Sequence, residues 1–249
     1  MEHKNFLERT YHLRTSDFDM RSRIFPSAVL DLFQDTAGEH ASSLGVGYTD
    51  LKDKNLCWML SRVAYRVLKQ PKLFSDVSVK TWPLLSKRTE FDRDFAVHSP
   101  EGETLIVGSS QWVIMDVSDR RHPKIVPARG FEMGIDGYIE ERSMEKPFRR
   151  IAPGFATDSE PYFTKSAYTD IDTNGHVNNI RYSNFVLNAL DLPPEKEIEF
   201  FRIDFLKEIM DGDPIKVTYK REGGSFLCRG ESGAGDGLSV NFIAELEIK

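Results

Sequence analysis

The sequence predicts an α+β fold made of two similar halves, each an antiparallel sheet packed on one long helix. A short motif occurs twice, because residues 16–24, SDFDMRSRI, align without gaps to residues 169–177, TDIDTNGHV. Each copy follows a strand-like stretch and precedes a helical pattern, and about four strand-like segments come after each helical pattern. The chain therefore reads as one structural unit repeated.

The helices are expected to begin directly after the two motif copies. In the first half, Pro26 occupies a position where a first-turn proline is tolerated, and the helix is expected to end before Gly45. One face of this helix is predicted from residues that recur at helical spacing, namely Val29, Leu32, Phe33, Thr36, Ala37, His40 and Leu44. In the second half a similar stripe begins at Tyr182 and ends before Pro193.

The strands are predicted from alternating β-branched and aromatic residues bounded by turn residues. The predicted segments lie at 57–68, 76–84, 90–99 and 103–117, and then at 199–206, 214–223, 225–232 and 238–248. Residues 118–160 are rich in proline, glycine and charge, and are expected to form a linker with a short helix near residues 135–142. We therefore expect a first domain at 1–117 and a second at 161–249.

Composition is typical of a soluble globular protein. The 249 residues are 40% hydrophobic and 29% charged, with no apolar run long enough for a bilayer and no signal-peptide core in MEHKNFLERTYHL. A cytoplasmic protein without a membrane partner is therefore expected. The net charge of −6 argues against nucleic-acid binding. Cys57 and Cys228 have no metal-type spacing and are expected to be buried thiols.

The segment TDIDTNGHVNN, residues 169–179, has some features of a calcium loop. Asp170, Asp172 and Asn174 fit the first ligand positions, and Gly175 fits the glycine position. However, the twelfth position is Arg181, a cation where calcium needs a bidentate glutamate, and the preceding residues are strand-like rather than helical. No metal site is therefore predicted.

Two interpretations of this segment remain open from the residues alone. It can be a polar turn that leads into a helix, with Asn174 or Asn178 as the cap. Yet the first copy has Met20 to Arg23 in its middle, so Asn174 and His176 are not needed to make the turn. A histidine at a helix N-terminus beside an amide and a carboxylate is also a candidate for catalysis.

The chain resembles the acyl-acyl carrier protein thioesterases. The resemblance is carried by DTNGHVNNIRY at 172–182, by IDFLKE ending at Glu208, and by first-half stretches such as LDLFQDTAGEHASSLG and MDVSDRRHPKIVP. It extends over nearly the whole chain. It implies a tandem double hotdog fold and an enzyme that hydrolyses acyl-acyl carrier protein, releasing free fatty acid in fatty acid biosynthesis without a cofactor.

Carried over residue by residue, the resemblance implies four catalytic residues, Asp172, Asn174, His176 and Glu208. Many plant members have a cysteine after this glutamate, where this chain has Ile209, so water rather than a thiol is the expected nucleophile. Glu208 is the first candidate for the general base, although the sequence leaves the choice between it and His176 open. Helix-start N–H groups, assisted by Asn174 or His176, are expected to bind the oxyanion, and Asp172 is expected to orient a neighbour.

The first half, which lacks the asparagine and histidine, is expected to bind the acyl chain. The candidate lining residues are Leu32, Phe33, Trp58 and Trp112. Acidic acyl carrier protein is the expected partner, met by basic residues at Arg120, Arg121, Lys124, Arg149 and Arg150. A monomer or a homodimer is expected.

Three other functions fit part of this pattern. An acyl-coenzyme A thioesterase would use the same chemistry on another carrier. A hotdog dehydratase would use a histidine and an acid to make an enoyl thioester, and a non-catalytic binder would hold the acyl thioester unchanged.

Overall fold

The computed structural model describes residues 5–85, 88–119, 121–135, 137–145, 148–190, 192–193, 195–233 and 237–249. The chain divides into two compact units, residues 1–147 and 148–249. Each unit carries one copy of the repeated motif.

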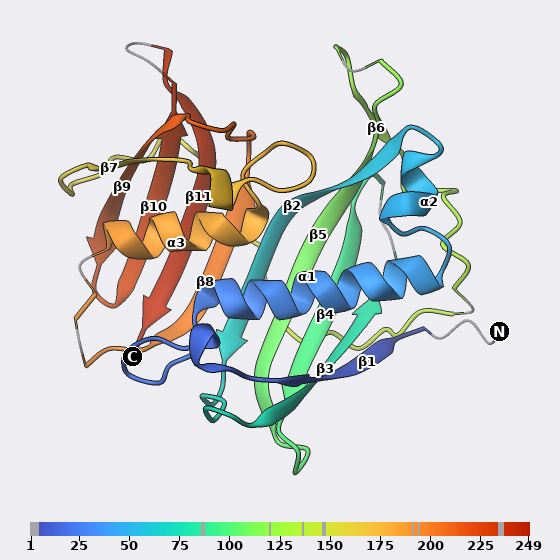
Figure 1. Cartoon of the computed structure of the whole chain (residues 1–249), viewed down its shortest axis with the longest axis horizontal. Helices are drawn as coiled ribbons and strands as arrows, with labels where there is room; N and C mark the ends of the chain where they lie inside the picture. Colours follow the sequence, from blue (N-terminus) through green and yellow to red (C-terminus); the bar gives the residue numbers. More distant parts are fainter. Residues whose placement is uncertain are drawn as a thin grey trace. The chain divides into compact units, whose positions relative to one another are not determined.

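The first unit is an antiparallel sheet with one long helix, α1, lying across it (Figure 1). Its elements are β1 (Leu7–His12), η1 (Thr15–Asp17), α1 (Pro26–Ser43), α2 (Tyr48–Lys52), β2 (Leu56–Val67), β3 (Asp76–Pro83), β4 (Phe91–His98), β5 (Thr104–Asp116) and β6 (Lys124–Val126). The strands follow the order β1-β3-β4-β5-β2, and β6 pairs with the outer part of β5.

The second unit repeats this plan with a shorter helix, α3 (Figure 1). Its elements are β7 (Tyr162–Lys165), η2 (Tyr168–Asp170), α3 (Asn179–Ala189), β8 (Ile198–Phe205), β9 (Pro214–Glu222), β10 (Ser225–Ser232) and β11 (Ser239–Ile248). The strand order is β7-β9-β10-β11-β8, which matches the first unit strand for strand. The predicted repeat, its two long helices and its strands are thus confirmed.

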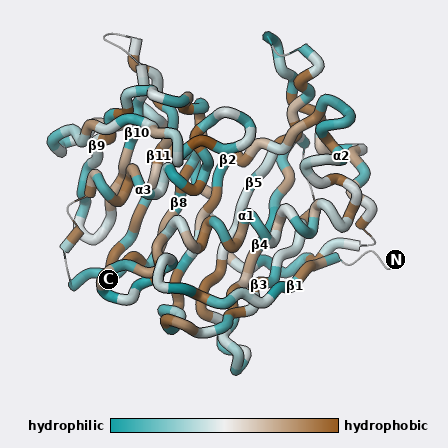
Figure 2. The backbone as a smooth tube through the Cα atoms, viewed as in Figure 1, coloured by the Kyte–Doolittle hydropathy of each residue, from teal (hydrophilic) through white to brown (hydrophobic). Residues whose placement is uncertain are grey.

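Each helix packs its apolar stripe on the sheet of its own unit, where hydrophobic residues follow the strands (Figure 2). In the first unit the ring of Phe33 stacks on Phe95 with centroids 4.2 Å apart, and it lies so close to β5 that a Cβ at Gly108 would meet it at 2.2 Å. In the second unit, Tyr182 makes edge contacts with Phe205 and Phe242 at 5.2 and 5.3 Å. These contacts form the cores beneath the helices.

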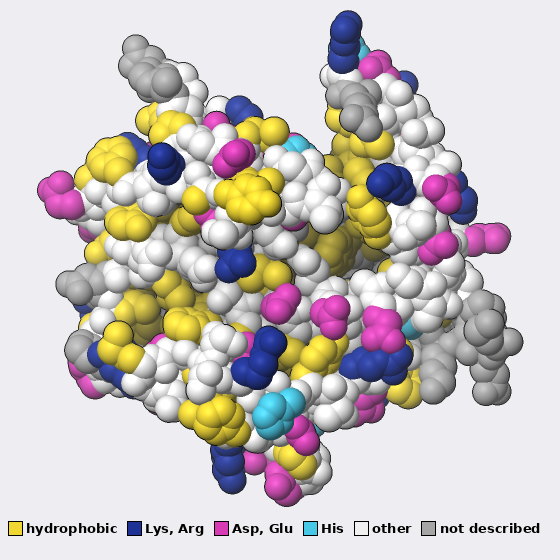
Figure 3. All heavy atoms as spheres, viewed as in Figure 1, with side chains coloured by type: hydrophobic (Ala, Val, Ile, Leu, Met, Phe, Trp, Pro, Cys, Tyr) yellow, Lys and Arg dark blue, Asp and Glu magenta, His cyan; other side chains and the backbone are white. Residues whose placement is uncertain are grey.

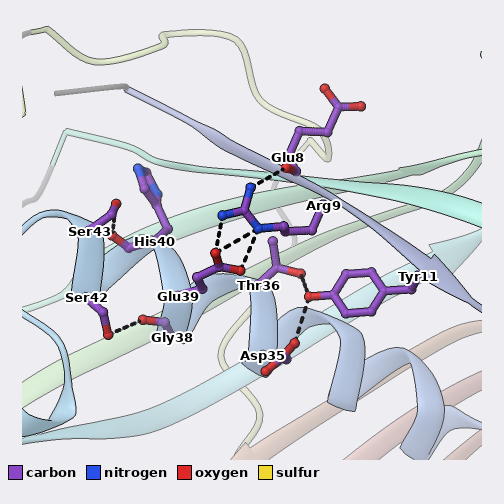
Figure 4. A network of polar contacts seen from close by, with 10 residues as sticks. All are labelled: Glu8, Arg9, Tyr11, Asp35, Thr36, Gly38, Glu39, His40, Ser42 and Ser43. Carbon is purple, nitrogen blue, oxygen red and sulfur yellow. Dashed lines mark hydrogen bonds and ion pairs between the residues drawn. The ribbon is translucent and has the colours of Figure 1, made fainter. Parts of the chain in front are cut away.

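The edge strand β1 is held to α1 by polar side chains (Figure 4). The guanidinium of Arg9 pairs with the carboxylate of Glu39. The hydroxyl of Tyr11 donates to Asp35 at 2.8 Å and lies 2.9 Å from the hydroxyl of Thr36. An edge strand pairs with a neighbouring strand on one side alone, and these contacts attach β1 to the helix in addition to its pairing with β3.

The segment between the two motifs contains one correction to the sequence analysis. No helix forms near residues 135–142 in the part that the structure describes. Gly134 and Gly137 both have positive φ, at 63° and 88°, which breaks a right-handed helix. The extended chain instead bonds to the sheet, where Trp82 donates to the Glu141 carbonyl at 3.0 Å and the N–H of Ser143 donates to the carboxylate of Asp94 at 2.7 Å.

None of the described helices has the length and apolar character that a membrane crossing requires.

Candidate active site

The predicted catalytic segment forms a tight loop between η2 and α3. The N–H of Asp172 donates to the carbonyl of His176 at 2.8 Å, and the N–H of Gly175 donates back to the Asp172 carbonyl at 3.0 Å. Gly175 has a φ of +83°, a conformation in which glycine avoids the strain of a side chain. The Asp172 carboxylate accepts the Asn174 N–H at 2.7 Å and lies 3.4 Å from its side-chain amide nitrogen. Asp172 therefore fixes the direction of Asn174.

The start of α3 follows this loop and is capped by Asn178. The Asn178 side chain accepts the N–H of Ile180 at 3.0 Å, and its own N–H donates to the Asp170 carbonyl at 2.8 Å. Asn178, rather than Asn174, is thus the cap. The N–H of Asn179 belongs to the same first turn, where amides have no acceptor within the helix and carry partial positive charge.

His176 and Glu208 come together from two different parts of the second unit. The imidazole Nε2 of His176 lies 3.3 Å from the carboxylate Oε2 of Glu208, with 31% and 50% of the two side chains exposed. An isolated antiparallel β-bridge pairs the backbone of His176 with that of Met210, and the N–H of Val177 donates to the Ile209 carbonyl at 2.9 Å. The pair is therefore held by backbone contacts, and it remains open to water and to a substrate.

Two further side chains in this region carry no role in the sequence analysis. The N–H of Ile209 donates to the hydroxyl of Tyr182 at 3.2 Å, and the side-chain amide of Asn241 donates to the Glu208 carbonyl at 3.0 Å. Burial raises the pKa of Tyr182, so its hydroxyl stays protonated. The available signal for Asn241 was a polar residue at a buried position of the apolar strand β11.

The first unit contains the same loop with different side chains. The N–H of Asp19 donates to the carbonyl of Arg23 at 2.8 Å, as Asp172 does to His176. The N–H of Ser22, at a φ of 59°, donates back to the Asp19 carbonyl at 3.0 Å, as Gly175 does to Asp172. The polar turn alone therefore does not require Asn174 or His176, and the first copy lacks both.

The four predicted lining residues do not form one group. Trp58 and Trp112 contact each other edge to face at 6.4 Å, and Trp58 also contacts Phe91 at 5.0 Å. Both tryptophans border the cluster around Phe91 and Ile114. Phe33 belongs to a separate contact group with Phe95 and is 2% exposed, while Leu32 is partly exposed on α1.

The predicted basic residues differ in their surroundings. Arg120 lies outside the described residues. Arg121, Lys124 and Arg150 are exposed, whereas Arg149 pairs with Glu245. On the face shown in Figure 3, basic and acidic side chains are interspersed.

The two cysteines, Cys57 and Cys228, are distant in sequence from the predicted catalytic segment at residues 169–179. Cys57 is partly exposed, which corrects the expectation that both thiols are buried, and Cys228 is fully buried in β10. Burial raises the pKa of the Cys228 thiol, which disfavours the reactive thiolate. Among the described residues, no three His, Cys, Asp or Glu side chains are grouped so that they could hold a metal ion.

Comparison with known proteins identifies the family. Residues 4–128 match the family described as Acyl-ACP thioesterase N-terminal domain, and residues 157–243 match the Acyl-ACP thioesterase C-terminal domain. The chain therefore belongs to the acyl-ACP thioesterase family, as the resemblance in the sequence predicted.

Related sequences and structures agree with this membership. A palmitoyl-acyl carrier protein thioesterase of Gossypium hirsutum is 29% identical over 82% of this chain and 51% of its own length. A dodecanoyl-[acyl-carrier-protein] hydrolase of Cinnamomum camphora is 26% identical over 90% of this chain and 61% of its own length. The chain thus spans about half the length of the curated relatives it matches.

An acyl-ACP thioesterase structure from Bacteroides thetaiotaomicron superposes over the whole of both chains, with a TM-score of 0.85 and 25% identity. A 12:0-ACP thioesterase from Umbellularia californica superposes with a TM-score of 0.83 and 23% identity, covering 99% of this chain and 98% of its own. The fold is a tandem double hotdog, which confirms the fold predicted from the resemblance.

Proposed function

We propose that this protein hydrolyses the thioester bond of acyl-acyl carrier protein with water and releases a free fatty acid. The observation that carries the proposal is the approach of His176 Nε2 to Glu208 Oε2 at 3.3 Å, beside the loop that directs Asn174. An acid, an imidazole and an amide at one open site match the needs of thioester hydrolysis, which are an activated water and donors for an oxyanion.

In the proposed reaction, Glu208 accepts a proton from water as the water oxygen attacks the thioester carbonyl carbon. His176 lies against the carboxylate and keeps it directed at this water. The negative charge that develops on the carbonyl oxygen is stabilised by the side-chain amide of Asn174 and the N–H of Asn179. Collapse of this intermediate breaks the C–S bond, and the departing thiolate takes the proton from Glu208.

We assign different tasks to the two domains, 1–117 and 161–249, and treat the segment between them as a linker whose first part pairs with the sheet of the first unit through β6. The first domain binds the acyl chain, and Trp58 and Trp112 are its best-supported lining residues because they lie together at an aromatic cluster. Phe33 and Leu32 contribute from α1. The second domain carries the catalytic residues.

The proposed partner is an acidic acyl carrier protein. Exposed Arg121, Lys124 and Arg150 would meet it, and Arg149 would contribute less because Glu245 already neutralises it. A carrier-bound acyl chain is a biosynthetic intermediate, so we place the protein in fatty acid biosynthesis, and in the cytoplasm as the sequence analysis expected.

The test is release of thiol from a panel of acyl-acyl carrier proteins and acyl-coenzyme A esters, using the unaltered protein, His176→Ala and Glu208→Ala. Rapid release that both variants lose is the expected result. Formation of an enoyl thioester without free thiol, or equal rates in all three proteins, would overturn the proposal.

The carrier can be identified in the same assay by adding salt. A rate that falls steeply from low to physiological ionic strength with acyl carrier protein, and not with the coenzyme A ester, is expected for a broad charged interface. The double variant Arg121→Glu/Lys124→Glu should lose this salt dependence. A preference for coenzyme A that salt does not change would contradict the proposed partner.

A further inference from the structure

The two units allow the surroundings of Glu208 to be compared with an equivalent position that has no glutamate. In the second unit, the N–H groups of Leu206 and Lys207 both donate to the Asn241 carbonyl, at 2.7 and 3.1 Å. In the first unit, the N–H groups of Leu68 and Lys69 both donate to the Leu105 carbonyl, at 2.9 and 3.1 Å. These matching bonds show which positions of the two units are equivalent. Gln70 corresponds to Glu208, Pro71 to Ile209, and Leu105 to Asn241.

Three hydrogen bonds hold the two peptide units that follow Glu208. Asn241 donates its side-chain amide to the Glu208 carbonyl at 3.0 Å. The next residue, Ile209, donates its N–H to the Tyr182 hydroxyl at 3.2 Å and accepts the N–H of Val177 at 2.9 Å. Two of these three bonds need a particular side chain, that of Tyr182 or that of Asn241.

The first unit lacks both of these side chains. The alignment of residues 16–24 with 169–177, continued without gaps, gives Val29 as the equivalent of Tyr182, and Leu105 stands at the position equivalent to Asn241. Pro71 has no N–H to donate, so the bond that Ile209 makes cannot form there. The Gln70 side chain instead accepts the N–H of Ile24 at 3.2 Å and is used in holding the loop. The tyrosine, the asparagine and the glutamate are therefore present in one unit and absent together in the other.

Keeping the two polar side chains buried has a cost in stability. Tyr182 is 3% exposed and Asn241 is fully buried. Among the described residues the Asn241 Oδ1 has no hydrogen-bond partner, and a buried polar atom in this state destabilises the fold. Leucine fills the equivalent place in the first unit without this cost, so packing alone does not account for the asparagine.

We propose that Tyr182 and Asn241 are positioning residues that hold the Glu208–Ile209 peptide from its two edges, and so keep the Glu208 carboxylate at His176. The proposal rests on the proposed function, in which Glu208 is the general base. The Glu208 side chain is half exposed, so its direction depends on the backbone from which it extends.

The first experiment measures kcat and KM for acyl-acyl carrier protein with Tyr182→Phe and Asn241→Leu. Tyr182→Phe keeps the ring that packs on Phe205 and Phe242, and removes only the hydroxyl. We expect kcat to fall about 10-fold in each variant with KM unchanged, because a base displaced by a fraction of an ångström loses rate rather than binding. Tyr219→Phe, which removes a hydroxyl from β9 of the same unit, should leave kcat unchanged.

A second experiment separates positioning from general destabilisation by repeating Tyr182→Phe and Asn241→Leu in a Glu208→Gln background. With the base gone, neither change should lower the remaining rate further. The same loss in both backgrounds would overturn the proposal, as would full kcat in both single variants or a rise in KM alone. If Glu208→Gln itself keeps full activity, the proposed function fails instead, and the two failures are thereby distinguished.

Discussion

Glu208 and Gln70 occupy equivalent positions in the two units, but their side chains have different partners. The Gln70 side chain accepts a backbone N–H from Ile24, whereas the Glu208 carboxylate lies 3.3 Å from the imidazole of His176. In the second unit the corresponding N–H, that of Val177, is satisfied by the Ile209 carbonyl, which leaves the carboxylate unused by the fold. One structural plan thus yields a structural amide in one unit and an available acid in the other.

Replacement of Glu208 by glutamine should therefore remove activity while leaving the fold intact. Loss of a general base typically costs 10²–10⁴ in rate, so we expect kcat to fall by at least about 100-fold, with KM nearly unchanged. The matched control is Gln70→Glu, which should keep full kcat because that position faces the loop of the first unit. Steady-state kinetics on both variants, with the melting temperature as a check, would decide this, and equal rates for Glu208→Gln and the unaltered protein would contradict it.

Two glycines of the first unit should respond to alanine in opposite directions. A Cβ at Gly108 would meet the ring of Phe33 at 2.2 Å, and that ring is already stacked on Phe95, so we expect Gly108→Ala to cost roughly 1–3 kcal/mol of unfolding free energy. A Cβ at Gly38, in the exposed face of α1, meets nothing within 4 Å. Gly38→Ala should stabilise by about 0.5–1 kcal/mol. Urea unfolding of both variants measures the difference, and a shift of the same sign in both would refute the packing argument.

The regular elements follow the sequence pattern closely where that pattern is local. The helix α1 begins at Pro26 as expected, because its proline and apolar stripe act within a few turns, and the alternating residues of β10 gave its limits, Ser225–Ser232. The short helix α2 was missed because five residues are too few to show a helical period. A helix near residues 135–142 was wrongly expected, because bonds to the distant strands β3 and β4 determine that segment.

The candidate site was predictable only where a motif marked it. Asn174 and His176 stand in a distinctive segment, and the resemblance supplied Glu208. The role of Tyr182 depends on an N–H that the folded chain brings to its hydroxyl, and Asn241 is marked in the sequence by nothing more than its polarity within an apolar strand. Such contacts join residues far apart in sequence, so a single sequence gives little sign of them.

Tyr11 should make the stability of the protein fall in alkali. Partial burial, with the nearby Asp35 carboxylate adding to it, raises the pKa of Tyr11 to about 12 from its usual value near 10. The unfolded chain therefore loses this proton first, so the stabilisation is complete below pH 10 and disappears as the pH rises through about 12. At pH 8, Tyr11→Phe should be less stable by about 1 kcal/mol through its lost hydrogen bond.

The measurement for Tyr11 is the difference in urea midpoint between the unaltered protein and Tyr11→Phe at several pH values. Using a difference cancels the titration of other tyrosines, which both proteins share. The gap should shrink between pH 10 and 12. A gap that stays constant or widens over this range would show that Tyr11 does not titrate as described.

The buried ion pair of Arg202 and Asp204 should contribute far more to stability than a pair at the surface. Arg202 is 1% exposed and donates two bonds to Asp204, both at 2.8 Å. Among the residues that the structure describes, Asp204→Ala leaves this buried cation with Glu245, 3.9 Å away, as its charged partner. We expect a loss of about 3 kcal/mol. The matched control is Glu103→Ala, which breaks the exposed pair with Lys69 and should cost less than about 1 kcal/mol. Urea unfolding at neutral pH compares the two variants, and similar losses in both would mean that the backbone carbonyl of Arg149, which also accepts from Arg202, satisfies the guanidinium without Asp204.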